Sequence, residues 1–112
     1  MWPDKSVQRT LTSNIRMSTE LSELLADFAG ALTSATFAPD EYPTFGYVNY
    51  ESNMADLRDL WSRIKPQLSR AEHVEFIDSK LAELFGAFAA GEKSRGRAAV
   101  MAIYNLDVKR LK

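Results

Sequence analysis

Apolar residues recur every three or four positions from Ser18 onward, which is the spacing of one face of an α-helix. The first apolar stripe consists of Leu21, Leu24, Leu25, Phe28, Ala29 and Leu32. Ser18 or Thr19 is suited to cap the start of this helix, because a hydroxyl oxygen accepts from the first free backbone amides. The stripe fades after Thr33, and Pro39 interrupts it. The pattern therefore predicts a first helix that begins near residue 18.

Two further stripes follow. One begins near Ser52 or Asn53 and stops before Pro66, which disfavours the helical conformation of the preceding residue. Its apolar positions are Met54, Leu57, Leu60, Trp61 and Ile64. The next opens with a predicted capping box from Ser69 to Glu72 and stops at Gly91, the residue favoured in a left-handed helix end. Its apolar positions are Val74, Ile77, Leu81, Leu84, Phe85 and Phe88. These stripes predict the second and third helices.

The segment from Lys93 to Arg110 predicts a fourth helix of a different kind. Ala98 to Tyr104 is apolar at seven consecutive positions, so apolar residues surround the predicted helix. Such a helix is usually buried on more than one side, which favours a central position in the fold. An alternative is that the helix is shared between the core and a second copy of the chain, giving a homodimer. A strand over Val100 to Tyr104 is the third interpretation.

The expected fold is all-α, with four main helices in an antiparallel bundle and a long, ordered, aromatic-rich loop between the first and second. A chain of 112 residues is near the commonest size of a single domain. Residues 1–16 lack a sustained period and are interpreted as a flexible N-terminal extension, with residues 17–112 as one helical domain. Leu11 and Ile15, four positions apart, allow the alternative that the first helix begins earlier.

The loop from Phe37 to Tyr50 holds five of the twelve aromatic residues and two of the four prolines. Long connections are often fixed by large apolar groups that fold back onto the core. Phe37 and Phe45 are therefore interpreted as anchors of the loop. Tyrosine is enriched at protein interfaces and its hydroxyl is easily satisfied near water. Tyr42, Tyr47 and Tyr50 are thus the candidate binding residues.

Charge is distributed unevenly along the chain. Residues 1–17 carry a net charge of +2, residues 18–92 carry −8 and residues 93–112 carry +5. Arg95 and Arg97 fall in the first turns of the predicted fourth helix, where the helix dipole disfavours cations. One hypothesis is that they form an anion site with Ser94 and the helix amides. The alternative is that both arginines pair with acidic residues of the same chain, such as Glu83 or Glu92.

Several kinds of chemistry find no support in the sequence. The chain has no cysteine and a single histidine, His73, and it carries no nucleophile, phosphate-loop or dinucleotide motif. No cofactor, metal site or catalytic residue is therefore predicted, and a non-enzyme is favoured. The lack of cysteine and of a long apolar run favours a cytoplasmic protein without a membrane segment. The strongly acidic body disfavours nucleic acid as a partner.

The function expected from these patterns is a small soluble protein-interaction or regulatory module whose partner is another protein. One alternative is a protein that binds a small ligand or anion through Arg95, Arg97 and the aromatic loop. A further alternative is a toxin-neutralising, immunity-type protein. The exposure of Tyr42, Tyr47 and Tyr50 distinguishes a contact surface from the lining of a pocket.

Overall fold

The computed structural model describes the backbone of residues 5–44 and 46–111, and the side chains of residues 20–44 and 46–111. The described residues form four α-helices and two short 3-10 helices and include no strand. The helices are α1 (Lys5–Ala35), α2 (Tyr50–Ile64), η1 (Lys65–Gln67), α3 (Ala71–Ala89), α4 (Lys93–Tyr104) and η2 (Val108–Arg110). The protein is therefore mostly helical, as the apolar stripes predict.

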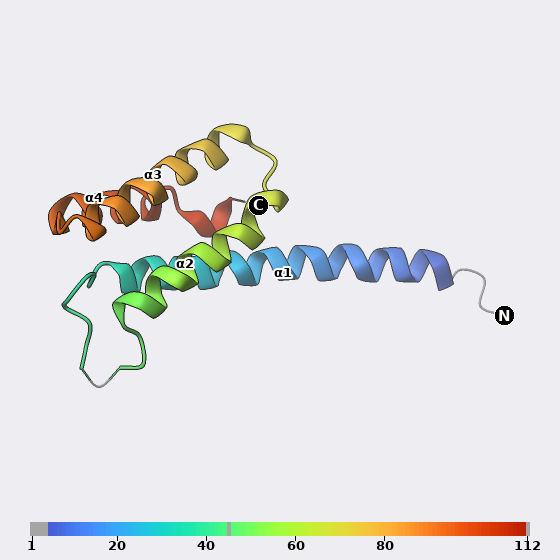
Figure 1. Cartoon of the computed structure of the whole chain (residues 1–112). Coiled ribbons are helices and arrows are strands. Elements are labelled where there is room, and N and C mark those ends of the chain that lie inside the picture. Colours follow the sequence, from blue (N-terminus) through green and yellow to red (C-terminus); the bar gives the residue numbers. More distant parts are fainter. Residues whose placement is uncertain (1–4, 45, 112) are drawn as a thin grey trace.

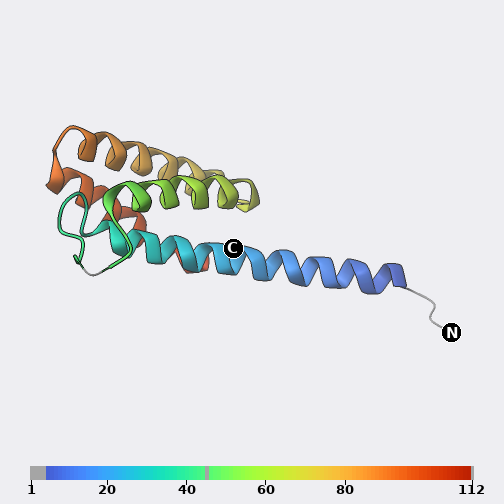
Figure 2. The same ribbon diagram turned by 60° about the horizontal axis from the view of Figure 1, so that its bottom comes forward.

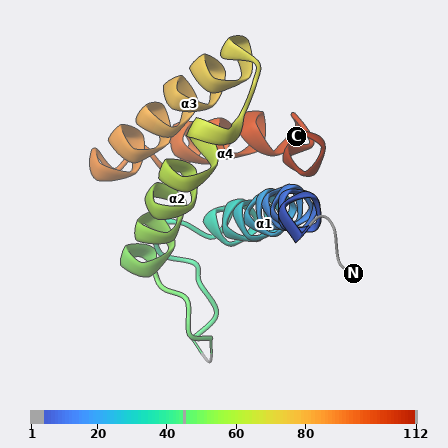
Figure 3. The same cartoon turned by 90° about the vertical axis from the view of Figure 1, so that its right-hand side faces the viewer.

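The helices are arranged as two pairs. Helix α2 crosses α1, and α3 lies beside α4, to which it is joined by three residues (Figure 1). The pairs meet where α4 and η2 pack against α1, as the view along α1 shows (Figure 3). The first half of α1 extends beyond the other helices (Figure 2). The loop that joins α1 to α2 lies at the end of α1 that packs against α4.

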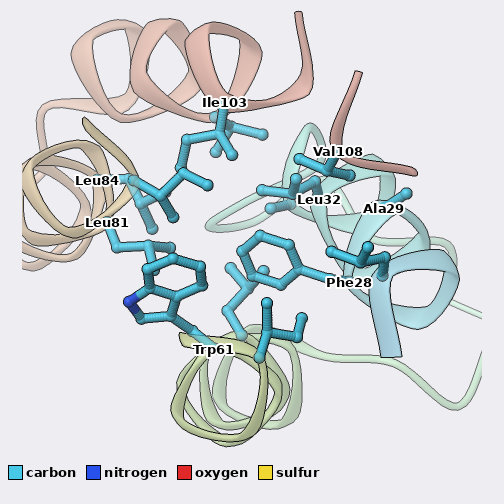
Figure 4. Close-up of a cluster of buried hydrophobic side chains, with 14 of the residues drawn as sticks. Phe28, Ala29, Leu32, Trp61, Leu81, Leu84, Ile103 and Val108 are labelled. Carbon is cyan, nitrogen blue, oxygen red and sulfur yellow. The ribbon is translucent and has the colours of Figure 1, made fainter. Parts of the chain in front are cut away.

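The core lies between the two pairs and draws side chains from every α-helix and from η2 (Figure 4). Phe28 of α1 stacks on Trp61 of α2, with ring centroids 5.9 Å apart and an interplanar angle of 24°. Leu81 and Leu84 of α3 and Ile103 of α4 close the cluster. The buried positions reproduce the predicted stripes, because burial of one apolar face is the main stabilising contribution to a short helix.

Helices α1 and α2 begin earlier than the sequence suggests. Helix α1 starts at Lys5 rather than near residue 18, so it continues through most of the proposed extension. The division of the chain at residue 16 stays a prediction. Helix α2 starts at Tyr50, with Asn49 as its N-cap. The Asn49 side chain accepts from the Ser52 amide at 2.8 Å, and the Ser52 hydroxyl accepts from the Asn49 amide at 3.0 Å. This reciprocal capping box fixes the end of the loop.

The capping box predicted from Ser69 to Glu72 is wrong, because α3 begins one residue later. Arg70 is the N-cap, in an extended conformation and without a side-chain capping bond. The partly buried side chain of Leu68 packs against the core just before this point, so tertiary packing determines how the chain enters α3. The predicted stop at Gly91 is confirmed, since this residue adopts a φ of 78°.

Helix α4 is shorter and less buried than predicted. It ends at Tyr104, and Asp107 then takes a left-handed conformation with a φ of 56° that leads into η2. Val100 and Ile103 are fully buried, but 40% of Met101 and 45% of Tyr104 remain exposed. The interpretation as a central helix buried on several sides is therefore wrong. One face of α4 packs on α1 and α3, and the opposite face is open.

Helices α3 and α4 approach each other closely at Gly96. A Cβ atom added to this buried glycine would overlap the ring of Phe88 on α3. The missing side chain lets the Phe88 ring lie directly on the α4 backbone. Helices α3 and α4 can therefore pack closely at this point.

Candidate functional site

The loop between α1 and α2, residues 36–49, is attached to α4 through Arg97. The guanidinium Nε donates to the Ala38 carbonyl at 2.9 Å, and Nη2 donates to Oε2 of Glu41 at 2.9 Å. The planar fork of arginine suits such a double contact, which fixes direction as well as distance. Ala38 itself is fully buried. The first part of the loop is therefore held against α4 rather than free in solvent.

Lys93, one turn before Arg97 on α4, reinforces this attachment. Its Nζ lies 2.7 Å from Oε1 of Glu41 and 2.9 Å from Oδ1 of Asp40. The hydrogen bonds that Glu41 accepts from Lys93 and then from Arg97 lower the pKa of Glu41, and the bonds that Lys93 donates to Glu41 and then to Asp40 raise the pKa of Lys93. We call Asp40, Glu41, Lys93 and Arg97 the loop clamp. Its members are partly exposed, so it fixes geometry more than it adds stability.

The loop is also attached to α2, through Tyr42. Its hydroxyl donates to Oδ1 of Asn53 at 2.7 Å, and Nδ2 of Asn53 donates to the Ala31 carbonyl at 2.9 Å. Asn53 is 1% exposed, and its two bonds link the loop, α2 and α1. The pKa of Tyr42 is raised to about 12, first by burial and then by the neighbouring Tyr50, while the nearby Arg97 opposes the shift. Tyr42 thus serves as a structural tie.

Tyr50 is also partly buried and packs against the core. Its ring meets Phe88 edge to face, with centroids 6.2 Å apart. Such pairs are a favoured arrangement of aromatic rings. With Asp40, Glu51 and others, Tyr42 and Tyr50 line an open depression of about 420 Å³. Tyr42 and Tyr50 therefore line this depression and hold the loop in place, and their rings are only partly accessible.

Tyr47 differs from both. Its relative exposure is 101%, which means that the whole side chain faces solvent, and the adjacent Val48 is 38% exposed. The loop around it is attached at the loop clamp, at Tyr42 and at the Asn49 cap. An exposed aromatic side chain is thus presented on a loop that is tied at both ends.

One of the two expected anchors of the loop does not follow the prediction. Phe37 is 41% exposed, so its interpretation as a core anchor is wrong. The chain turns at the end of α1 in such a way that the small side chain of Ala38 is buried in its place. Phe45 lies outside the described residues. The loop is held by polar contacts and by Tyr42, which the apolar pattern did not indicate.

A second hollow lies between α1 and α2. This groove, with a volume of about 430 Å³, is lined on the α1 side by Ala26, Asp27, Gly30, Ala31 and Ser34. Val48 of the loop and Asn53, Asp56, Asp59 and Leu60 of α2 complete it. We call it the α1–α2 groove. Asn53 joins its two walls through the bond to the Ala31 carbonyl.

The two arginines of the predicted anion site lie next to carboxylates of the same chain. Arg95 lies 3.1 Å from Glu92 and 3.6 Å from Glu83, the partners named in the alternative interpretation. Arg97 belongs to the loop clamp, and Ser94 is exposed at the start of α4. Both guanidinium groups therefore already have carboxylate partners. Anion binding at this place stays a prediction, and an anion would have to compete with these carboxylates.

Asn53, Glu41 and Lys93 were not predicted as site residues. Asn53 occupies a position four residues before Leu57 and eight before Trp61, so it is a polar residue on the apolar stripe of α2. That pattern is a usable signal for a buried hydrogen-bonding group. Glu41 and Lys93 are 52 positions apart, and no local pattern relates them.

In the part of the chain that the structure describes, no group of three or more histidine, cysteine or acidic side chains is placed to hold a metal ion. None of the described helices combines the length and the apolar character that crossing a bilayer requires. The chain matches no family model, no curated protein and no solved structure.

Proposed function

We propose that this protein is a protein-interaction or regulatory module that binds another protein through the loop between α1 and α2. The observation that carries the proposal is the complete exposure of Tyr47 on a loop tied at both ends. Tyrosine is a frequent hot-spot residue, and burial of one aromatic side chain removes roughly 150–250 Å² from water. Ties that fix the loop beforehand reduce the entropy lost on binding.

The charges around the loop support a basic partner. Asp40, Glu41 and Glu51 carry exposed carboxylates in or beside the loop, and only the first two have described cationic partners. Excess negative charge next to a contact residue attracts positively charged proteins and accelerates association. The proposal therefore places Tyr47 at the centre of the contact and assigns Glu51, whose carboxylate has no described cationic partner, to its rim.

Photo-crosslinking in the cells that make the protein tests the proposal. A benzophenone amino acid replaces Tyr47 in one variant and Ser79, an exposed residue of α3, in a control. We expect one dominant protein adduct from position 47 that is absent from position 79, and excess wild-type protein should suppress it. Identical adducts from both positions, or none at position 47, would contradict the proposal.

A second candidate is homodimerisation through α4. Met101 and Tyr104 lie three positions apart, so they are neighbours on the open face of this helix, and 40% and 45% of them are exposed. Two such side chains form a small apolar surface that a second copy would cover. We propose that the four α-helices form an antiparallel bundle. Such a bundle would leave this face of α4 on the outside, where a second copy can reach it. The short connection of residues 90–92 supports that arrangement.

A further inference from the structure

The α1–α2 groove combines apolar and small residues with carboxylates. Ala26, Gly30 and Ala31 of α1, Leu60 of α2 and Val48 of the loop supply the apolar lining. Asp27, Asp56 and Asp59 supply the charge, and all three are exposed. From Ala26 to Ser34 the α1 wall is about 12 Å long, or roughly two turns of a helix. The groove is thus long enough for two turns of another helix.

The groove carboxylates are poorly neutralised by the protein itself. No ion pair joins Asp27 or Asp56 to another described residue, and Asp59 lies 3.8 Å from Arg63 with both side chains more than half exposed. By contrast, Asp40, Glu41 and Glu83 each have a lysine or arginine of α3 or α4 at 3.1 Å or less. A positively charged ligand in the groove could therefore pair with these carboxylates without first displacing a lysine or arginine of the same chain.

Gly30 provides a separate indication. It lies inside α1 and is exposed, and a Cβ atom added there would meet nothing within 4 Å. Glycine inside a helix is less stable than alanine by roughly 0.5–1 kcal/mol. Packing within this chain therefore does not require glycine at this position. A glycine in the wall of a groove does allow another backbone to approach closely.

We propose that the α1–α2 groove receives a basic amphipathic helix of the partner protein. The inference rests on the proposed function and names the partner's chemistry. The apolar face of the incoming helix covers Ala31, Leu60 and Val48, and its lysine or arginine side chains face the three aspartates, as in other helix-in-groove complexes. Val48 directly follows Tyr47, so the groove continues the proposed contact surface.

The first test uses a model peptide of about 15 residues, long enough to form an amphipathic helix when bound, built from leucine, alanine and lysine. Amide resonances of the protein are followed by NMR during titration. We expect the largest shifts at Asp27, Gly30 and Asp56, weaker binding as salt is added, and no shifts with a peptide carrying glutamate in place of lysine. Shifts confined to the open face of α4, or none at these residues, would overturn the proposal.

Substitutions provide the second test. Gly30→Ala should raise the stability of the fold and weaken peptide binding roughly fivefold or more, as expected at a contact position. Gly86→Ala is the matched control, because Gly86 is an exposed glycine of α3 whose Cβ would also meet nothing. It should give a similar gain in stability and leave binding unchanged. Equal binding by both variants and the wild type would contradict the proposal.

The charge is tested separately. Asp27→Asn combined with Asp56→Asn should weaken binding roughly tenfold and reduce its salt dependence, since both unpaired carboxylates are lost. Glu72→Gln combined with Glu75→Gln removes the same charge from the exposed surface of α3 and should have little effect. If these pairs behave alike, the groove is not the site. A Tyr47 crosslink that persists in that case would leave the proposed function standing without the groove.

Discussion

The hydroxyl of Tyr42 donates a hydrogen bond of 2.7 Å to Oδ1 of Asn53, which is 1% exposed. Tyr42→Phe removes the donor and leaves a buried oxygen without its partner, which costs about 1–3 kcal/mol. We expect the free energy of unfolding in urea to fall by that amount. Tyr104→Phe is the control, because Tyr104 is 45% exposed, and it should change stability by less than about 0.5 kcal/mol. Equal effects would argue against a structural role for the bond.

Stability should decrease at alkaline pH through the same residue. The pKa of Tyr42 is raised from 10.0 to about 12, so the folded state holds the proton more tightly than the unfolded state. The stabilisation is complete below pH 10 and is lost as the pH rises from 10 to 12. Unfolding free energies measured across this range should fall more steeply for the wild type than for Tyr42→Phe. Parallel curves would contradict the assignment.

The loop clamp should weaken in acid. Lys93 and Arg97 lower the pKa of Glu41, so its contribution is present above the ordinary glutamate value of 4.5 and is lost as the pH falls through the lower folded value. The backbone amide of Glu41 donates to the Phe37 carbonyl at 2.8 Å and reports on this part of the loop. We expect Glu41→Gln to reduce the protection of this amide from hydrogen exchange at neutral pH. Asp59→Asn, which removes an exposed pair on α2, should leave it unchanged.

Two glycines should respond to alanine with opposite signs. Gly96→Ala forces a Cβ atom into the Phe88 ring, and such overpacking costs roughly 1–3 kcal/mol. Gly86→Ala meets no obstacle and should stabilise α3 by up to about 1 kcal/mol through helix propensity. Thermal unfolding of the two variants measures both effects. A Gly96→Ala variant as stable as the wild type would show that α3 and α4 are not closely packed at this point.

Homodimerisation makes a prediction about mass. If α4 forms the contact, light scattering at a concentration well above the dissociation constant should give twice the chain mass of 12.6 kDa. Met101→Glu should return the protein to a monomer, because it places a charge within the apolar surface of α4. Glu75→Lys, on the exposed surface of α3, should leave the mass unchanged. A monomer at all concentrations would refute the dimer.

The apolar stripes predicted the helices well because each helix buries one face. Leu25 and Leu32 of α1 and Leu57 and Ile64 of α2 are fully buried at the positions that the helical period indicates. Helix ends were harder to predict. The predicted second helix begins near Ser52, three residues after the observed cap at Asn49, and the predicted fourth helix continues to Arg110, past the left-handed turn at Asp107. Such ends depend on where the chain must turn to reach the core.

The candidate site was only partly predictable. The sequence indicates Tyr47 as one of three candidate tyrosines but does not distinguish it from Tyr42 and Tyr50, because the burial of those two depends on Asn53 and Phe88. The loop clamp joins residues more than fifty positions apart, so no local period encodes it. The buried Asn53 was visible as a polar residue on an apolar stripe, and its partners became clear only from the packing of α1 against α2.

The basic side chains of α4 act as internal counterions for the rest of the chain. Residues 18–92 carry a net charge of −8, and Lys93, Arg95 and Arg97 contact four of their carboxylates, those of Asp40, Glu41, Glu83 and Glu92. A fragment that stops before residue 93 would therefore lose more than the apolar face of one helix. Its remaining charges would repel one another, and that self-repulsion opposes a compact state. Helix α4 thus offsets part of the negative charge of the chain that precedes it.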